Sequence, residues 1–235
     1  MKITTVLFDL DGTLLPMDQD VFIKTYFGML VKKIAPYGYA PELLVDTIWK
    51  GTVDMVENDG EKTNERRFWD RFVSVFGEDS LKDMPLFDEF YEKDFDKVQA
   101  SCGFDPMASV SVGEIRKMGY RVALATNPVF PMAATERRIK WAGLSKDDFE
   151  LVTTYENSRF CKPSLGYYRD IVDALCVSPE ECLMVGNDVS EDMITEELGM
   201  KTFLLPACLI NKGGEDIGKY PHGDLSQLVE FVRSL

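Results

Sequence analysis

Two aspartates near the start of the chain, Asp9 and Asp11, are the first residues whose types and spacing indicate chemistry. They follow an apolar run over residues 6–8 that predicts a buried strand, and Gly12 allows a sharp exit from it. Ligands of open α/β sheets bind at the carboxyl ends of strands. Two carboxylates held this close repel each other unless a cation or a shared proton intervenes, so the pair indicates metal binding or acid–base chemistry. The competing interpretation is a turn marked by Asp-Gly, with Asp9 as a helix cap.

Three later segments place polar groups where a strand is expected to end or a helix to begin. Thr126 offers a hydroxyl and Asn127 a backbone N–H before a helix, which together make a small anion site. Lys162 supplies a positive charge suited to a phosphate or a carboxylate. Asp188 adds to Asp9 the hard oxygen ligands that Mg²⁺ prefers. An aspartate can also act as the nucleophile that takes a phosphoryl group, and a second one can deliver a proton.

The segment from residue 105 onward alternates strands with helices, which predicts a parallel sheet with right-handed crossovers. In a doubly wound sheet of this kind the four polar segments meet at one edge. We expect strands over 120–125, 151–154, 182–185 and 202–205, and helices over 107–117, 131–141, 165–175, 191–198 and 225–232.

Residues 17–100, between the first strand and this series, show helical periodicity and no strand pattern. The predicted fold class is therefore α/β: a doubly wound, Rossmann-like parallel sheet with an all-helical cap inserted into it. We expect the core to comprise residues 1–15 and 105–235, and the cap residues 16–104. The four cap helices are expected over 21–34, 43–56, 63–76 and 87–98.

The composition argues against several classes of function. The 235-residue chain carries a formal net charge of −14, which disfavours duplex nucleic acid and anionic membranes as partners. No apolar run approaches the roughly 20 residues of a membrane span. The five cysteines show no CxxC spacing and no signal peptide is apparent, which favours a cytoplasmic location. The single histidine, His222, argues against a histidine-based triad or zinc site.

Taken in order, four short segments resemble the four motifs of the haloacid dehalogenase (HAD) superfamily. They are residues 9–13 (DLDGT), Thr126-Asn127, Lys162-Pro163 and residues 186–192. The helical insert directly after the first segment resembles the C1 cap of the phosphoglycolate phosphatase and β-phosphoglucomutase-like branch. The resemblance covers nearly the whole chain, and four motifs in order at strand ends are far more specific than any one of them.

The resemblance implies a role for each matching residue. Asp9 is expected to be the nucleophile, and Asp11 the general acid/base that protonates the leaving alcohol and then activates water. The carboxylates of Asp9 and Asp188 and the backbone carbonyl of Asp11 would hold Mg²⁺. Lys162 would neutralise charge on the transferred phosphoryl group. The residues implied in substrate binding are Leu10, Thr126, Asn127 and Lys162.

One departure from the family pattern lies in the last motif, where Asn187 stands between Gly186 and Asp188. We take Asp188 as the metal ligand because Asp188 and Asp192 keep the DxxxD spacing, and the alternative for Asp188 is a helix cap. Asp192 is expected to orient Lys162 or to cap a helix.

The cap also contains aromatic and basic side chains that could contact a substrate. Trp49 and Trp69 lie on apolar stripes, which predicts that they are core residues. Three arginines lie in a charge-rich helix and are expected to face solvent: Arg66, Arg67 and Arg71.

Together these expectations describe a Mg²⁺-dependent phosphatase that acts on a small phosphorylated metabolite through an aspartyl-phosphate. Three alternatives stay open: a phosphomutase that retains the intermediate, a phosphonatase that takes an amine from the cap, and a binding module that kept the fold without turnover. A dehalogenase is disfavoured because those relatives lack the second aspartate, here Asp11.

Overall fold

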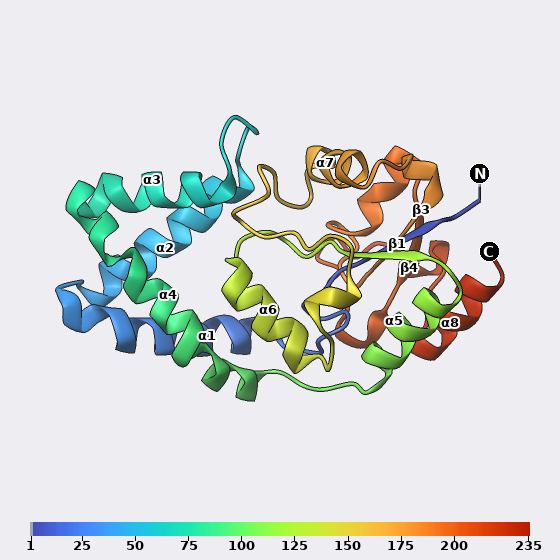
Figure 1. The fold of residues 1–235 in the computed structure, drawn as a ribbon, viewed down its shortest axis with the longest axis horizontal. Coiled ribbons are helices and arrows are strands. Elements are labelled where there is room, and N and C mark those ends of the chain that lie inside the picture. The colour runs from blue at the N-terminus through green and yellow to red at the C-terminus, as the bar shows by residue number, and fades with distance from the viewer. Residues whose placement is uncertain (1) are drawn as a thin grey trace.

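A four-stranded parallel sheet forms one end of the molecule in the computed structural model, which describes residues 2–235 (Figure 1). Its strands, in the order β2-β1-β3-β4, are β1 (Thr5–Phe8), β2 (Arg121–Leu124), β3 (Cys182–Gly186) and β4 (Lys201–Leu204). Phe8, the last residue of β1, pairs with Leu124 of β2 and Val185 of β3. This register brings the polar segments that follow β1, β2 and β3 together at one edge of the sheet.

Helices cover both faces of the sheet, and every residue of β1 and β3 is buried as a result. Val6 and Phe8 point to the face covered by α5 (Met107–Lys117) and α8 (Leu225–Arg233) (Figure 1). Leu7 points to the opposite face, which α7 (Leu165–Leu175) covers. The alternation along β1 thus builds the three-layer α/β core that the sequence predicts.

The other end of the molecule is helical and is drawn blue to green in Figure 1. Its helices are α1 (Gln19–Ile34), α2 (Pro41–Val56), α3 (Asn64–Phe76) and α4 (Met84–Lys93). The Asp18 side chain accepts a hydrogen bond from the Val21 N–H and so caps α1, and Thr63 caps α3 in the same way. The helical part contacts the sheet domain through α6 (Met132–Trp141), which packs against α4. None of the helices within residues 2–235 is both long enough and apolar enough to cross a membrane.

The two connections between the sheet domain and the helical cap run side by side. The Gly103 N–H donates to the Pro16 carbonyl at 2.7 Å, and Met17 pairs with Cys102 in an antiparallel bridge. They therefore form a short two-stranded joint rather than two independent linkers.

The expected strand over 151–154 is not a regular strand. A single residue of it, Val152, bridges Leu124 at the edge of the sheet. The pairing with β2 ends after Thr153, whose N–H donates to the Leu124 carbonyl at 3.1 Å, because the Tyr155 N–H donates to the Phe130 carbonyl at 3.0 Å instead of to β2.

Two expected helices also differ from the observed ones. The segment 191–198 forms a 3₁₀ helix, Met193–Leu198, rather than an α-helix. Its first turn is tightened because the Thr195 hydroxyl donates to the Asp192 carbonyl at 2.8 Å and competes for it with backbone groups. The fourth cap helix ends at Lys93, and the chain continues as a 3₁₀ helix, Phe95–Ser101.

Candidate active site

A buried lysine joins two carboxylates at the edge of the sheet. Lys162 Nζ donates to Asp9 Oδ1 at 2.8 Å and to Asp192 Oδ1 at 2.6 Å. Its side chain is 1% exposed. Burial disfavours the ammonium, but the carboxylates of Asp192 and then Asp9 outweigh it and raise the pKa of Lys162 well above its usual value. Lys162 is therefore a fixed positive charge beside Asp9.

Asp192 is held in place from both sides. Its Oδ2 accepts the backbone N–H groups of Asn187 at 3.1 Å and Asp188 at 3.0 Å. A side chain at Gly186 would overlap the Asp192 carboxylate, so the approach requires glycine there. The pKa of Asp192 is raised overall, chiefly by burial and also by the Asp9 carboxylate, although Lys162 and the Asp188 N–H oppose the rise. The ammonium at 2.6 Å supports the ionised pair, so the structure places Asp192 where it orients Lys162.

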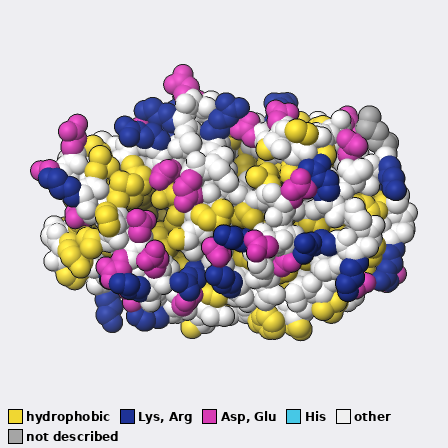
Figure 2. All heavy atoms as spheres, viewed as in Figure 1, with side chains coloured by type: hydrophobic (Ala, Val, Ile, Leu, Met, Phe, Trp, Pro, Cys, Tyr) yellow, Lys and Arg dark blue, Asp and Glu magenta, His cyan; other side chains and the backbone are white. Residues whose placement is uncertain are grey.

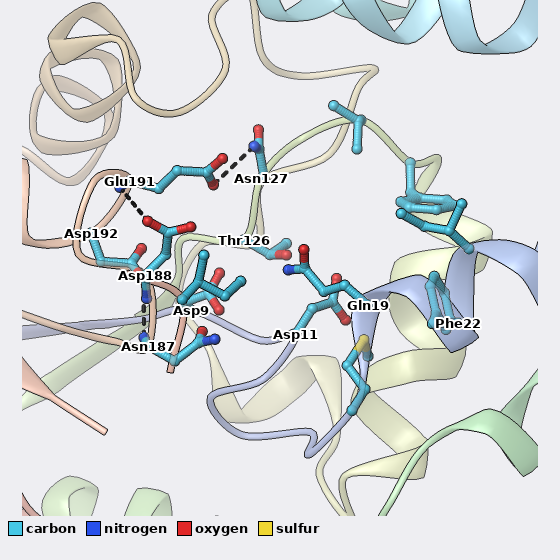
Figure 3. A pocket seen from close by; sticks show the side chains of 15 residues that line it. Asp9, Asp11, Gln19, Phe22, Thr126, Asn127, Asn187, Asp188, Glu191 and Asp192 are labelled. Atoms are coloured by element: carbon cyan, nitrogen blue, oxygen red, sulfur yellow. Dashed lines mark hydrogen bonds between the residues drawn. The ribbon is translucent and has the colours of Figure 1, made fainter. Parts of the chain in front are cut away.

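Asp188 and Asp9 each keep one carboxylate oxygen free of protein partners. Asp188 Oδ1 accepts the Ser190 N–H, the Ser190 hydroxyl and the Glu191 N–H, at 2.8, 2.7 and 2.9 Å. Its Oδ2, and Oδ2 of Asp9, make no hydrogen bond within residues 2–235. Figure 3 shows the two side chains next to each other in one cavity.

This donor set fits a magnesium ion. Two carboxylates with one open oxygen each are what Mg²⁺ takes from a protein when water and a phosphate complete its shell. No group of three His, Cys, Asp or Glu side chains within the described residues could hold an ion on its own. The backbone carbonyl of Asp11 accepts no hydrogen bond within residues 2–235, so it is open to act as the further oxygen ligand that the sequence resemblance implies.

The loop after β2 presents the predicted phosphate-binding groups. The Thr126 carbonyl accepts the hydroxyls of Thr153 at 2.8 Å and Tyr167 at 2.9 Å, which fixes the loop. Asn127 Nδ2 donates to Glu191 Oε2 at 3.1 Å, while its backbone N–H has no acceptor within residues 2–235. Thr126 and Asn127 both line the cavity that contains Asp9.

Leu10 can serve a substrate only through its backbone. Its side chain is buried in the core and does not line the cavity. Its carbonyl accepts the N–H groups of the next turn, from Thr13, Leu14 and Leu15. The backbone N–H of Leu10 is the group left for a ligand.

Arg138, on α6, is a site residue that the sequence reasoning missed. It is 0% exposed, and its Nη1 forms an ion pair with Asp11 Oδ2. Nη2 donates to Thr135 Oγ1 at 3.2 Å, and the guanidinium carbon lies 4.5 Å from the centroid of the Phe130 ring. Burial raises the pKa of Asp11, and the positive charge of Arg138 opposes that rise. Asp11 Oδ1 accepts no hydrogen bond from any of the described residues.

A signal for Arg138 was present in the periodicity of its helix. Ala134, Arg138 and Trp141 are spaced at i, i+4 and i+7 and form the buried face of α6. An arginine on such a face must be paired when it is buried. The neighbouring Arg137 lies on the outer face of the same helix, so residue type alone does not tell the buried arginine from the partly exposed one; position on the helix does.

Asn187, the extra residue in the last motif, ties that motif to the first. Its Oδ1 accepts the Thr13 hydroxyl at 2.8 Å, and its Nδ2 donates to the Cys208 carbonyl at 2.7 Å. The side chain fills the space where Gly12 would otherwise carry a Cβ, and Gly12 has a φ of +87°. Asn187 therefore fixes the position of the loop that carries Asp11.

The start of α3 is anchored to the sheet domain near this site. Asn64 is fully buried, and its Nδ2 donates to the Pro128 carbonyl at 3.2 Å. The backbone N–H groups of Asn64 and Glu65 donate to the carbonyls of Ser158 and Tyr155, each at 2.8 Å. The cap is thus attached to the core by hydrogen bonds as well as by the two-stranded joint.

Two adjoining cavities lie between cap and core. The inner one, about 180 Å³, contains Asp9 and Asp188, and the outer one is about 280 Å³. Trp49, expected in the core, is 51% exposed and lines the outer cavity, because α2 faces that cavity there rather than a packed helix. Trp69 is buried as expected and also lines it. The cap arginines line neither cavity and pair with acidic residues: Arg66 with Asp70, Arg67 with Asp59, and Arg71 with Asp54.

Comparison with known proteins gives a consistent result. A family model described as a haloacid dehalogenase-like hydrolase matches residues 3–195. The pyrophosphatase PpaX of Bacillus cereus (strain ATCC 10987 / NRS 248) is 26% identical over 208 residues, which covers 86% of this chain and 82% of PpaX. The HAD phosphatase from Thermococcus onnurineus superposes with a TM-score of 0.59 at 21% identity, covering 99% and 98% of the two chains. The HAD-hydrolase YfnB from Bacillus subtilis, solved with magnesium bound, gives 0.58 at 17% identity, covering 99% of each.

A parallel α/β core with a helical cap, and a lysine that joins two carboxylates beside a third, define a hydrolytic enzyme of the HAD type. The chain belongs to the haloacid dehalogenase-like hydrolase family. The predicted family, fold class and enzyme class are therefore confirmed, and the roles of individual residues stay predictions.

Proposed function

We propose that the chain is a Mg²⁺-dependent phosphatase that hydrolyses a small phosphate monoester through an aspartyl-phosphate on Asp9. Residues 1–15 and 105–235 would form the catalytic core and residues 16–104 the cap that closes over it. The observation that carries the proposal is the Lys162 ammonium between Asp9 and Asp192, 2.8 and 2.6 Å from their oxygens, beside the open oxygen of Asp188. This arrangement concentrates positive charge where a phosphoryl group would meet Asp9.

In the first half of the reaction, a carboxylate oxygen of Asp9 attacks phosphorus. The bond from phosphorus to the leaving oxygen breaks, and that oxygen keeps the electron pair and takes the proton of Asp11. In the second half, Asp11 accepts a proton from water, the water oxygen bonds to phosphorus, and the bond to Asp9 breaks to release inorganic phosphate.

The remaining residues position the phosphoryl group. Thr126 and the backbone N–H of Asn127 would bind its oxygens, and Lys162 would offset the charge that develops on them. Mg²⁺, held by Asp9, Asp188 and the Asp11 carbonyl, would supply further positive charge at the same oxygens.

The test is phosphate release from a panel of monoesters with and without Mg²⁺. The panel includes pyrophosphate, because curated relatives are pyrophosphatases. We expect release to need the metal, and Asp9→Asn to abolish it, with Asp170→Asn in an exposed ion pair as the control. Mass spectrometry of acid-quenched enzyme should show one added phosphoryl group that Asp9→Asn lacks. Folded enzyme that releases no phosphate with any divalent metal would instead support a binding module.

A further inference from the structure

The outer cavity continues directly from the inner one. A phosphate ester with its phosphorus at Asp9 would therefore extend its leaving group into the outer cavity. The six residues that line both cavities are Gln19, Ile23, Asn127, Val129, Phe130 and Glu191. Figure 3 shows Asn127, Glu191 and Gln19 standing around the inner cavity. Whatever group lies beyond the phosphate is therefore selected by the walls of the outer cavity.

Those walls carry no positive charge. No lysine, arginine or histidine within the described residues lines the outer cavity, and its one ionisable carboxylate is Glu191. Hydrophobic and acidic side chains border a hollow at the helical end of the face shown in Figure 2. A second anionic group on the substrate would be desolvated there without a positively charged partner, next to a carboxylate, which is strongly unfavourable.

The walls are instead mainly aromatic, with contributions from all four cap helices. Trp69 and Phe87 meet edge to face with centroids 5.3 Å apart, and Phe27 lies 6.2 Å from Trp49 at the exposed side. Such rings pack well against another ring. A dry apolar cavity of about 150 Å³ holds benzene, so about 280 Å³ has room for one ring with a short substituent.

One polar group in these walls lacks a partner. Trp69 Nε1 is buried and donates no hydrogen bond within residues 2–235. The neighbouring group is the Tyr155 phenol, whose pKa is raised by burial, a rise that the nearby Trp69 N–H opposes. The Trp69 N–H and the Tyr155 phenol are nevertheless not in hydrogen-bonding geometry, so the indole N–H stays unpaired among the described residues. The hydroxyls of Tyr26 and Tyr91 are paired with each other at 2.8 Å. A neutral acceptor on the guest would satisfy the indole N–H.

We infer that the preferred substrate is the phosphate monoester of an uncharged aromatic or arylalkyl alcohol, rather than pyrophosphate or a phosphorylated carboxylic acid. This rests on the proposed function, because it assumes that phosphorus is attacked at Asp9. The geometry assigns ring recognition to the aromatic walls formed by Phe68, Trp69, Phe87 and Phe130, and exclusion of anions to Glu191.

The experiment compares kcat/KM for 2-phenylethyl phosphate, ethyl phosphate, 2-phosphoglycolate and pyrophosphate with Mg²⁺ present. The first two share an alkyl leaving oxygen, so their ratio reports on the ring rather than on leaving-group reactivity. We expect kcat/KM for 2-phenylethyl phosphate to exceed that for ethyl phosphate at least about tenfold, and to exceed by more the values for 2-phosphoglycolate and pyrophosphate, which carry a second anionic group. A single methylene is already worth about 10-fold or more in such a pocket. Competitive inhibition by 2-phenylethylphosphonate should likewise exceed that by phosphonoacetate, a readout that needs no turnover.

Variants on α2 sharpen the test. Thr52→Lys places an ammonium in the outer cavity and should shift preference toward 2-phosphoglycolate, whereas Thr52→Met should not. Val53→Lys, on the same helix but outside the cavity lining, is the matched control. Equal rates for the phenyl and ethyl esters, or a preference of the wild type for either anionic substrate, would overturn the inference and leave the phosphatase standing. Absence of Asp9-dependent phosphate release from every compound would overturn the phosphatase and the inference with it.

Discussion

Replacing Arg138 with methionine should destabilise the protein and change its pH profile together. Arg138→Met keeps the aliphatic stem but removes the one ion-pair partner that Asp11 has within residues 2–235, where Asp11 Oδ1 makes no hydrogen bond either. Breaking a buried ion pair by removing one member costs about 3–5 kcal/mol. Asp11 keeps 21% of its side-chain surface open to the cavity and can be partly hydrated or protonated. We therefore expect a loss near the lower end, about 3 kcal/mol.

The sign of the pH effect follows from the charges. Arg138 lowers the pKa of Asp11 against the rise caused by burial, so its removal should raise that pKa further. An alkyl phosphate needs Asp11 protonated for the leaving oxygen, so Asp11 should set the alkaline limb of kcat/KM. That limb should move to higher pH in Arg138→Met.

Urea unfolding and pH–rate profiles of four proteins check this reasoning: wild type, Arg138→Met, Asp11→Asn and the double variant. Asp11→Asn removes the carboxylate, so the double variant should recover stability, with a coupling energy of at least about 1 kcal/mol. Thr135→Val removes the weaker 3.2 Å contact of Arg138 and should cost much less. A loss below about 1 kcal/mol in Arg138→Met, or an additive cycle, would refute the role of the pair.

Further expectations concern the loop, the cap contact and pH. Gly12→Ala should cost about 2 kcal/mol in urea unfolding, and more than Gly38→Ala, which shares the positive φ but meets no neighbouring atom. Asn64→Ala should raise KM about tenfold with a smaller change in kcat, and an unchanged KM would contradict a role in cap closure. Burial and the Glu156 carboxylate raise the pKa of Glu65 above its usual 4.5. Protonated Glu65 therefore adds to the free energy of unfolding, fully below about pH 4.5, and this contribution is lost as the pH rises through the raised pKa. Glu65→Gln should therefore flatten the fall in unfolding free energy above that pH, measured by urea titration.

The parts of the site that could be predicted are those that short motifs place at strand ends. Asp9 and Asp188 lie close together because the parallel register aligns the ends of β1 and β3, and strand ends can be located from apolar runs. Lys162, in the loop before α7, reaches Asp9 from a motif of its own. Asp192 reaches Lys162 because its spacing from Asp188 brings it back across the same turn.

What could not be predicted depends on partners far away in sequence. Trp49 lies on an apolar stripe like Trp69, yet only the arrangement of the other cap helices decides that one faces a cavity and the other is buried. The partner of Arg138 is 127 residues away, so its pairing with Asp11 is invisible along the chain even though the stripe on α6 marks its burial.

The Asn64 anchor has a geometric consequence for how the enzyme opens. A body joined at two neighbouring points can rotate about the line through them, whereas a third point away from that line removes this freedom. The joint at Pro16 and Gly103 supplies the first two points, and the buried amide on α3 supplies the third. We therefore expect a product too large for the mouth of the outer cavity to leave only after these hydrogen bonds have broken.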